Sequence, residues 1–201
     1  MRAALLATQA GPLAGDRDSV RIIVGAGATL VVEPVAATLA LPGPSTTLLR
    51  LDVRVEHGGR LVLDEGPLIV AMGARVQRRC VIELQEGAVA ALRETVVLGR
   101  DGEGPGALDA SVRVVLAGRV LVHDGLRFGA RAAPHVALAP GHRVAATACL
   151  LGMRDPTGMQ LEGPGAMLRA TGPSLAGVER TISAPWTAWS EAVLRSLVVS
   201  P

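Results

Sequence analysis

Histidine and cysteine are the side chains of this 201-residue chain that most readily bind metals or take part in acid–base and nucleophilic catalysis. The histidines are His57, His123, His135 and His142, and the cysteines are Cys80 and Cys149. No two histidines stand four residues apart, and no histidine adjoins a cysteine. The spacing therefore predicts neither a helical zinc motif nor a mixed cysteine–histidine metal centre.

His123 and the two cysteines each allow two interpretations. His123 precedes Asp124, so the pair is either a lone acid–base or metal-binding element or, as we expect, the solvated end of a strand. Cys80 and Cys149 stand in apolar, strand-like segments, which favours small core residues over reactive or metal-bound thiols. Two cysteines outside any Cys-x-x-Cys pair build no disulfide framework, which is typical of a reducing, cytoplasmic setting.

The sequence motifs of the common enzyme classes are missing. There is no Gly-x-Ser-x-Gly, no phosphate-binding loop and no His-Glu-x-x-His. Gly25-Ala26-Gly27 leads from one strand-like segment into another, whereas a phosphate-binding loop is followed by a helix. No nucleophile–base pair or metal cage can be assembled from the remaining residues. We expect the protein not to be an enzyme and to have no tightly bound cofactor.

Composition argues against nucleic acid and membranes as partners. The formal net charge is +2, all twenty basic residues are arginine, and the aromatic residues are one Phe and two Trp. The stacking platforms of single-stranded nucleic-acid binders are therefore missing, and a GC-rich genome explains the arginines more simply than phosphate recognition. No apolar run reaches the roughly 18 residues of a membrane span. The apolar stretch at residues 1–6 is too short for a signal peptide.

A repeat of strand, glycine-bearing turn and strand recurs along the chain. Its turns contain Gly27, Gly59, Gly87 and Gly118. In residues 51–55 apolar side chains alternate with Asp and Arg, which places one strand face inward and the other outward. The pattern predicts successive antiparallel β-hairpins, which must stack because a single hairpin is marginal in water. We expect a mainly β fold, an elongated body that resembles a solenoid or a sandwich.

The C-terminal stretch has a helical pattern. Ser174 is a candidate N-cap of a short helix over 175–181, and Ser183-Ala184-Pro185 is typical of a second helix start, with proline in its first turn. Four apolar residues then follow at helical spacing: Trp186, Trp189, Val193 and Leu197. Glu191 stands four residues before Arg195, which favours an ion pair on the helix surface.

The sequence predicts a single domain over residues 1–201, to which this helical segment belongs. We expect a hairpin body over about 1–172 and a helical segment over about 173–198. The helical segment is predicted to close an open end of the β body, with the two tryptophans in its core.

The most distinctive segment lies at residues 66–79. The Asp64-Glu65-Gly66-Pro67 turn is predicted to break a strand, and an apolar stretch and then an Arg/Gln-rich strand follow it. At this point the chain resembles the urease accessory proteins of the UreD/UreH family. In that family a proline-punctuated PLI…GA…Q stretch follows the second hairpin, and this chain has Pro67-Leu68-Ile69, Gly73-Ala74 and Gln77.

Shorter matches occur in the family's order. Ala14-Gly15-Asp16 resembles the end of its Gly-Gly-Asp signature, and Ala36-Ala37-Thr38 resembles its Ala-Ala-Thr stretch. Glu94, followed by Gly99-Arg100 and Gly102-Glu103, is similar to its E…GR…GE segment. The Trp-bearing C-terminal helix also has the expected place, so the resemblance spans most of the chain.

The chain also departs from the family pattern. Family members usually carry a further pair of strands before the Gly-Gly-Asp signature, whereas here Met1 stands fifteen residues before Asp16. Either the start is miscalled or a first β layer is missing, which would leave a sheet edge to be covered. A polar run of the family aligns with Glu33-Pro34-Val35 and a basic position aligns with Leu39, so two polar groups and a charge are replaced.

The resemblance implies a role in urease maturation without enzymatic activity. Proteins of this family bind apo-urease and two further accessory proteins, one helical and one a GTPase, so that nickel is delivered to the urease metallocentre. The β body is thought to give the ion a water-filled passage. Such a passage needs oxygen groups that lower the cost of admitting a divalent cation, without a tight His/Cys site that would trap it.

Four residues are predicted to contribute to a transient nickel passage: Asp16, Glu33, Thr38 and Glu103. Glu33 is included as a substitute for the replaced polar positions. The alternative for Asp16 and Thr38 is that their side chains satisfy backbone groups in turns. The residues predicted to bind partner proteins are Pro67, Leu68, Ile69 and Arg100.

A second function remains open on the sequence. The chain could be an adaptor whose role is protein contact alone, or a degenerate relative without nickel transfer, with Leu68-Ile69-Val70 as docking surface. A continuous polar channel inside the β body would favour nickel passage over this alternative.

Overall fold

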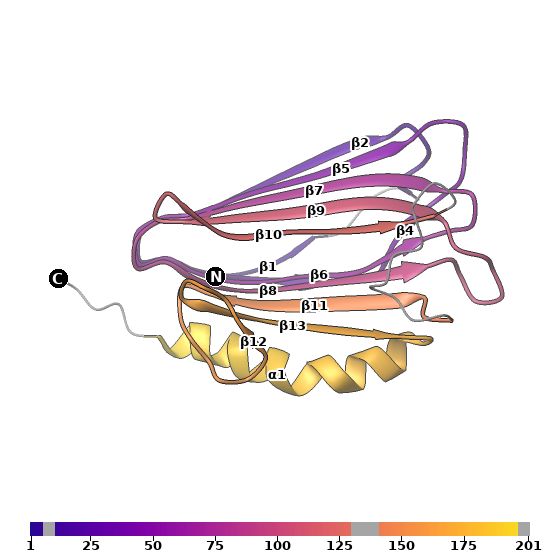
Figure 1. Ribbon diagram of the computed structural model, residues 1–201. Helices are drawn as coiled ribbons and strands as arrows, with labels where there is room; N and C mark the ends of the chain where they lie inside the picture. Colours follow the sequence, from indigo (N-terminus) through magenta and orange to yellow (C-terminus); the bar gives the residue numbers. More distant parts are fainter. Residues whose placement is uncertain (6–10, 130–140, 197–201) are drawn as a thin grey trace.

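Two stacked β-sheets and one long helix make up the computed structural model, which describes residues 1–5, 11–129 and 141–196 (Figure 1). Sheet A has the strand order β1 (Arg2–Leu5), β3 (Thr29–Pro34), β6 (Arg60–Val70), β8 (Val89–Leu98), β11 (Val144–Leu151), β13 (Gly165–Gly172) and β12 (Met159–Gln160), and β4 (Thr38–Ala40) also pairs with β6. Sheet B has the order β10 (Arg119–Phe128), β9 (Ala107–Leu116), β7 (Arg75–Leu84), β5 (Thr47–Val55) and β2 (Arg17–Val24).

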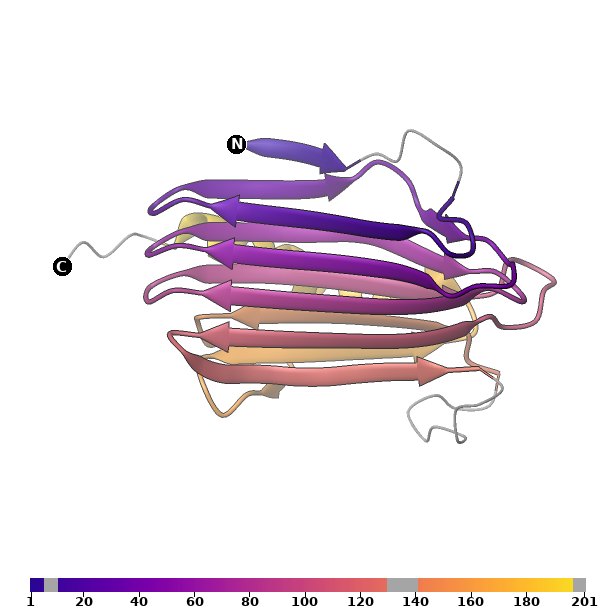
Figure 2. The same ribbon diagram turned by 90° about the horizontal axis from the view of Figure 1, so that it is seen from above.

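The first three glycine turns join the two sheets instead of closing hairpins. The chain passes from β2 to β3, from β5 to β6 and from β7 to β8, each time crossing from sheet B to sheet A. Strands of successive repeats then pair in parallel, β2 with β5 and β5 with β7 in one sheet, β3 with β6 and β6 with β8 in the other. Seen from above, the strands of the two sheets follow each other as the coils of a flattened solenoid (Figure 2).

Backbone hydrogen bonds hold the turns of neighbouring coils together. The Glu56 N–H donates to the Val24 carbonyl at 2.9 Å, and the Gln85 N–H donates to the Val55 carbonyl at 2.9 Å. Each turn has four residues and its third is a glycine with positive φ, as in Gly58 (φ 63°). Because the neighbouring coil satisfies the turn's polar groups, each coil depends on the next for its stability.

The fourth repeat is the one antiparallel hairpin among the four predicted. Only Ala117 and Gly118 connect β9 to β10, and both have positive φ, 46° and 80°. A two-residue loop with this geometry matches the twist of paired antiparallel strands. The mainly β, solenoid-like body with a C-terminal helix is therefore confirmed, whereas the hairpin pairing predicted for the first three repeats is wrong.

Two separate hydrophobic clusters fill the space between the sheets. One surrounds Leu61, Val53 and Ile82, and the other surrounds Val70, Val76 and Val96. They are displaced from each other along the strands, because β6, β7 and β8 contribute residues to both. Inward positions of these strands therefore alternate with outward ones as predicted, and the inward residues form the core.

A bulge in β6 replaces the predicted strand break. Asp64 pairs with Arg93 and Pro67 pairs with Thr95, so β6 has one extra residue across this step. Gly66 has a φ of 74°, and its N–H donates to the Asp64 carboxylate at 2.9 Å. The strand continues through the bulge because Gly66 absorbs the extra residue in the left-handed region. Asp64 and Glu65 are successive strand residues and point to opposite faces of sheet A.

The C-terminal helix α1 (Leu175–Arg195) lies along the outer face of sheet A (Figure 1). Ile182, Trp189 and Val193 are fully buried against Ala and Val side chains of the sheet. The Ser174 side chain caps the helix by accepting from the Gly177 N–H at 3.3 Å. The predicted cap and the core position of Trp189 are thus confirmed, but the helix covers a sheet face rather than an end of the β body.

A single helix replaces the two predicted short ones. Pro185 lies inside α1 and does not start a second helix. Packing of Ile182 before it and Trp189 after it on the same sheet face outweighs the loss of one backbone hydrogen bond. Arg195 donates to Glu191 at 2.9 Å, which confirms the predicted pair, and the predicted Leu197 lies outside the described residues.

Within the described residues, no helix combines the length and the apolar character that crossing a membrane would take.

Candidate functional site

A layer of polar side chains crosses the space between the sheets and separates the two hydrophobic clusters. Each strand contributes one inward-facing residue to this layer. On β6, Glu65 lies between the inward residues Leu63 and Leu68, and on β7, Arg78 lies between Val76 and Cys80. The other members are Thr38 on β4, Glu94 on β8, Asp124 on β10, Thr147 on β11 and Arg169 on β13. We call these seven residues the polar layer.

Three adjoining cavities follow the polar layer. An outer cavity of about 570 Å³ lies at the β2 and β4 side and includes Asp18, Thr38, Glu65 and Arg78 in its wall. A middle cavity of about 70 Å³ shares Thr38, Glu65 and Arg78 with it and adds Glu94. Because water needs roughly 10–15 Å³ of such space, the middle cavity has room for a few water molecules.

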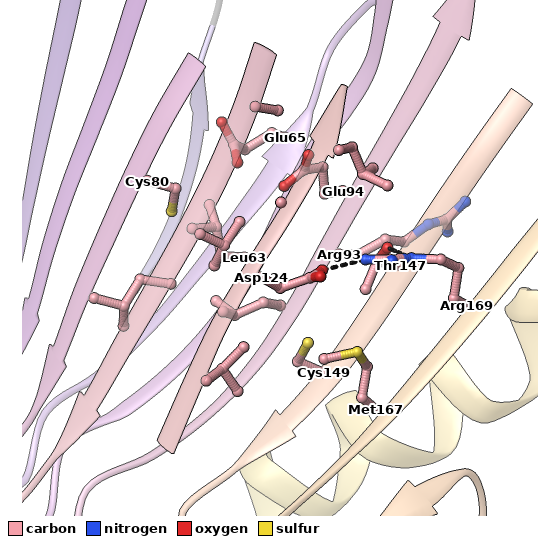
Figure 3. Close-up of a pocket in the computed structure, with 17 residues that line it drawn as sticks. Leu63, Glu65, Cys80, Arg93, Glu94, Asp124, Thr147, Cys149, Met167 and Arg169 are labelled. Atoms are coloured by element: carbon pink, nitrogen blue, oxygen red, sulfur yellow. Dashed lines mark hydrogen bonds and ion pairs between the residues drawn. The ribbon is translucent and has the colours of Figure 1, made fainter. Parts of the chain in front are cut away.

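The inner cavity, of about 40 Å³, adjoins the middle one through Glu65 and Glu94 and extends toward Asp124 and Arg169 (Figure 3). Its wall is mostly apolar, and Leu63 and Ile82 belong to it. The three cavities therefore lie one after another from the β2 side to the β10 and β13 side, with side chains of the polar layer between them.

Arg78 ties the two sheets together at the middle of this layer. Its guanidinium donates to the Glu94 carboxylate at 2.8 Å and also to the Glu65 carboxylate. The Arg78 side chain is 7% exposed, against 18% for Glu94 and 29% for Glu65. One buried cation thus lies between two carboxylates, each from a different strand of the opposite sheet.

Burial and charge act in opposite directions on this cluster. Burial raises the pKa of Glu65, and the nearby Arg78 offsets only part of that rise. Burial alone would lower the pKa of Arg78, but the charges of Glu94 and Glu65 outweigh it, so its pKa is raised and it stays a cation. With both carboxylates ionised the cluster carries one net negative charge, which attracts a further cation.

A second charge pair ends the polar layer on the opposite side. Arg169 forms an ion pair with Asp124 and donates from Nε to the Thr147 hydroxyl at 3.0 Å (Figure 3). The Arg169 and Asp124 side chains are 26% and 30% exposed, so this end lies closer to solvent than Arg78. Asp124 therefore faces inward, while its neighbour His123 is exposed at the surface, and the two do not form an acid–base element.

Three sulfur-containing side chains, Cys80, Cys149 and Met167, line the inner cavity (Figure 3). Burial raises the pKa of each cysteine thiol to about 12, so both thiols are protonated at neutral pH and are poor metal ligands. Both cysteines are buried, as expected for small core residues. Among the described residues no group of three His, Cys, Asp or Glu side chains is placed to hold a metal ion.

The four predicted nickel-passage residues are not brought together. Thr38 lines the outer and middle cavities. Asp16 lies just before β2, where its carboxylate accepts the Leu13 N–H at 2.8 Å. Glu33 is exposed on β3 and pairs with Arg2 at 3.4 Å.

Glu103 lies in the loop between β8 and β9 and organises it. Its carboxylate accepts the Met72 N–H at 3.4 Å, the Arg100 N–H at 3.2 Å and the Arg100 Nε at 2.8 Å. The Arg100 hydrogen bonds lower the pKa of Glu103 to about 2. Glu103 and Arg100, predicted respectively for nickel and for partner binding, thus contact each other outside the three cavities.

The other predicted partner-binding residues lie on β6 beyond the bulge. Leu68 is 7% exposed and packs between the sheets, while Pro67 and Ile69 are half-buried. Leu68 therefore offers little surface to a partner, because it belongs to the core.

Sequence reasoning missed most of the polar layer. Arg78, Thr147 and Arg169 were not singled out, Glu65 and Glu94 entered only as parts of motifs, and Asp124 was considered only together with His123. The usable signal was a charged residue two positions from apolar residues on both sides, as in Val76-Gln77-Arg78-Arg79-Cys80. Such a residue points inward in a strand that is otherwise apolar on that face.

Fold and site together define a flattened β-solenoid whose interior is crossed by a buried charged layer with cavities and whose outer sheet face is covered by a helix. A family model described as UreD urease accessory protein matches residues 1–200, and the chain belongs to this family. The resemblance inferred from short motifs is therefore confirmed.

Curated relatives agree with this assignment. The chain is 38% identical over 155 residues to "Urease accessory protein UreD 1" of Saccharopolyspora erythraea, and the aligned region covers 76% of this chain and 61% of the relative. It is 35% identical to "Urease accessory protein UreD 1" of Streptomyces griseus, over 94% of this chain and 77% of the relative. It is 40% identical to "Urease accessory protein UreD" of a Parafrankia species, over 77% of this chain and 56% of the relative. The match thus spans less than two thirds of two of these three relatives.

Proposed function

We propose that this protein takes part in the maturation of urease by passing nickel, as transient cargo, toward the metallocentre of apo-urease. Family membership supports the link to urease, since the relatives are named urease accessory proteins. The observation that carries the nickel role is the row of three cavities along the polar layer. In this proposal the cavities are successive parts of one ion passage between the sheets, and the protein acts in cytoplasmic metallocentre assembly without enzymatic activity.

The chemistry of the polar layer suits a cation that must move on. Carboxylates of Glu65, Glu94 and Asp124 and hydroxyls of Thr38 and Thr147 supply oxygen groups along the row, which lower the cost of bringing a divalent ion between the sheets. The protonated cysteine thiols do not compete for it. An ion that meets one or two oxygen groups at a time is bound too weakly to be trapped.

Thr38 is the predicted residue that this passage retains. Asp18, two residues after Asp16, lies at the wall of the outer cavity, and in this proposal it takes over the contribution to the passage that was predicted for Asp16. Asp16, Glu33 and Glu103 lie outside the cavity walls, and their contribution to the passage stays a prediction. In this proposal they support the passage indirectly: Asp16 holds the turn before β2, Glu33 pairs at the edge of sheet A, and Glu103 holds the loop between β8 and β9.

The proposed partners are apo-urease, a helical accessory protein and a GTPase accessory protein, for which this chain serves as scaffold. Pro67, Ile69 and Arg100 keep a proposed role in these contacts, because each remains at least partly accessible.

The outer face of sheet B favours the adaptor function as a second candidate. No helix among the described residues covers this face, in contrast to the outer face of sheet A (Figure 1). Its outward positions include five exposed arginines that form no ion pair with any described residue: Arg17, Arg21, Arg54, Arg79 and Arg113. Such a face suits an acidic protein surface and would serve a scaffold whether or not nickel passes.

Glu94→Gln tests the passage against the adaptor function. The amide keeps the shape of the side chain and a hydrogen-bond acceptor for Arg78 but removes the charge, so we expect at least fivefold lower nickel content and urease activity in cells that express the urease genes with the variant. The matched control is Glu83→Gln, an exposed glutamate on the outward face of β7, the preceding strand of the chain, in sheet B.

Pull-down of apo-urease completes the test. The nickel-passage function expects unchanged recovery of apo-urease with Glu94→Gln despite the lower nickel content. Full activation by Glu94→Gln would contradict the passage and leave the adaptor as the better function, and equal losses in both variants would show that charge removal acts on the protein surface.

A further inference from the structure

Arg78 occupies the position in the polar layer that a passing cation would need. Glu65 is the residue common to the walls of all three cavities, and Glu94 joins the middle and inner ones. Arg78 donates hydrogen bonds to both carboxylates at once. A divalent ion moving from the outer to the inner cavity would approach the same oxygen atoms, so the guanidinium and the ion compete for them.

Space for an alternative position of the Arg78 side chain exists on one side only. The outer cavity, of about 570 Å³, has Arg78 in its wall, whereas the middle and inner cavities measure about 70 and 40 Å³. Asp18 lies at the wall of the outer cavity and forms no ion pair within the described part of the chain. A long arginine side chain that leaves the two glutamates therefore finds both room and a negative charge there.

We propose that Arg78 is a gate, a cation built into the protein that closes the route from the outer cavity to the inner cavity until an incoming cation displaces it toward Asp18. The inference rests on the proposed nickel passage for its purpose, but the closure itself concerns this chain alone. In the closed state Arg78 pairs with both Glu65 and Glu94 and keeps the sheets together. In the open state the two carboxylates face the passage and Arg78 pairs at the outer cavity.

The two native cysteines report whether Arg78 closes the route. Cys80 and Cys149 line the inner cavity and neither lines the outer or middle one, so a reagent that enters from the outer cavity must pass Arg78 to reach them. We would follow modification of the purified protein by a small cationic methanethiosulfonate reagent, using intact-protein mass spectrometry. Single Cys80→Ala and Cys149→Ala backgrounds assign the modified thiol.

The expected result is at least tenfold faster modification in Arg78→Ala than in the unchanged protein. The matched control is Arg93→Ala on the other face of sheet A, where Arg93 is 13% exposed and forms ion pairs with Asp64 and Glu179. Arg93 belongs to the wall of the inner cavity but lines neither the outer nor the middle one, and its guanidinium is held by Asp64 and Glu179. Its loss leaves the route past Arg78 unchanged, so we expect the modification rate to stay within twofold of the unchanged protein. Equal acceleration in both variants, or none in Arg78→Ala, would overturn the gate and leave Arg78 as a static tie between the sheets.

A second variant protects the test against misfolding. Arg78→Ala leaves two carboxylates unpaired, so Arg78→Ala combined with Glu65→Gln, which lowers their mutual repulsion, is measured beside it and is expected to show the same acceleration. Failure of the gate and failure of the proposed function are distinguishable. Faster thiol modification in Arg78→Ala, together with normal urease activation by Glu94→Gln, would support the gate and reject nickel passage. Unchanged thiol modification in Arg78→Ala, together with reduced urease activation by Glu94→Gln, would support the passage and reject the gate.

Discussion

Arg78→Met removes the cation that Glu65 and Glu94 share while keeping an unbranched side chain between the sheets. Removing one partner of a buried ion pair costs about 3–5 kcal/mol, because the remaining charge is left unpaired. The Arg78 side chain is 7% exposed but that of Glu65 is 29% exposed, so solvent stabilises part of the charge that remains. We therefore expect the free energy of unfolding at about pH 8 to fall by about 3 kcal/mol, the lower end of that range.

The loss should depend on pH in a defined direction. Burial raises the pKa of Glu65, and without Arg78 nothing offsets that rise. A carboxyl group whose pKa is higher in the folded than in the unfolded state holds its proton more tightly when folded. Its contribution favours folding below the unfolded pKa and is lost as the pH rises through the folded pKa. Arg78→Met should thus recover part of the lost stability when the pH is lowered from about 8 to about 5, since the Glu65 carboxyl, with its raised pKa, takes up a proton more readily in the folded state.

Urea unfolding followed by the fluorescence of Trp186 and Trp189 measures both effects. The control is Arg127→Met, because Arg127 is 67% exposed and pairs with Asp109 on the surface, where an ion pair contributes about 0.2–1 kcal/mol. A loss in Arg78→Met no larger than in Arg127→Met, or a loss that does not shrink in acid, would refute the view of this cluster as two buried carboxylates held by one cation.

Three further outcomes follow from single contacts. Trp189→Ala should lower the free energy of unfolding, measured by the same urea titration, by about 3–5 kcal/mol, because Trp189 is fully buried between α1 and sheet A. Trp186→Ala should lower it by less, because Trp186 is half-buried. Gly59→Ala should lower the thermal midpoint, because an added methyl would lie 2.8 Å from Val55 Cγ1 and 2.9 Å from a carbonyl oxygen in the same turn. The pKa of Glu103, lowered to about 2, means that its stabilisation is present at neutral pH and lost as the pH falls from the unfolded value toward about 2. The protection of the loop between β8 and β9, meaning its hydrogen-exchange rate compared with the intrinsic amide rate at the same pH, should therefore fall in acid in the unchanged protein, and Glu103→Gln should lack this protection already at neutral pH.

The strands were predictable from sequence but three of their four pairings were not. Alternation in segments such as 51–55 and glycine in the turns both indicate strand, turn and strand, whichever partner the strands choose. Turn length holds the missing information. Two residues, Ala117 and Gly118, produce a hairpin, whereas the four-residue turns at 25–28, 56–59 and 85–88 carry the chain from one sheet to the other.

The position of α1 depended on tertiary packing that local signals do not contain. Pro185 after Ser183 is typical of a helix start, and this local preference suggested two helices. The apolar outer face of sheet A, with small side chains such as Ala91 and Ala148, offers a surface along which one long helix buries Ile182 and Trp189 together. Only the assembled sheet reveals that surface, so the sequence favoured the wrong boundary and the wrong location.

The polar layer is the part of the candidate site that argues most directly for a function. A core built for stability alone would place apolar side chains at these positions, because replacing a buried ion pair by well-packed apolar groups is often neutral or stabilising. Here apolar clusters do flank the layer on both sides along the strands, and the charges are confined to the one level at which the cavities lie. Arg78 on sheet B and Glu65 and Glu94 on sheet A meet there although their strands are otherwise apolar inside. Folding alone does not require that coincidence of charge and cavity, whereas the proposed route for ions between the sheets does.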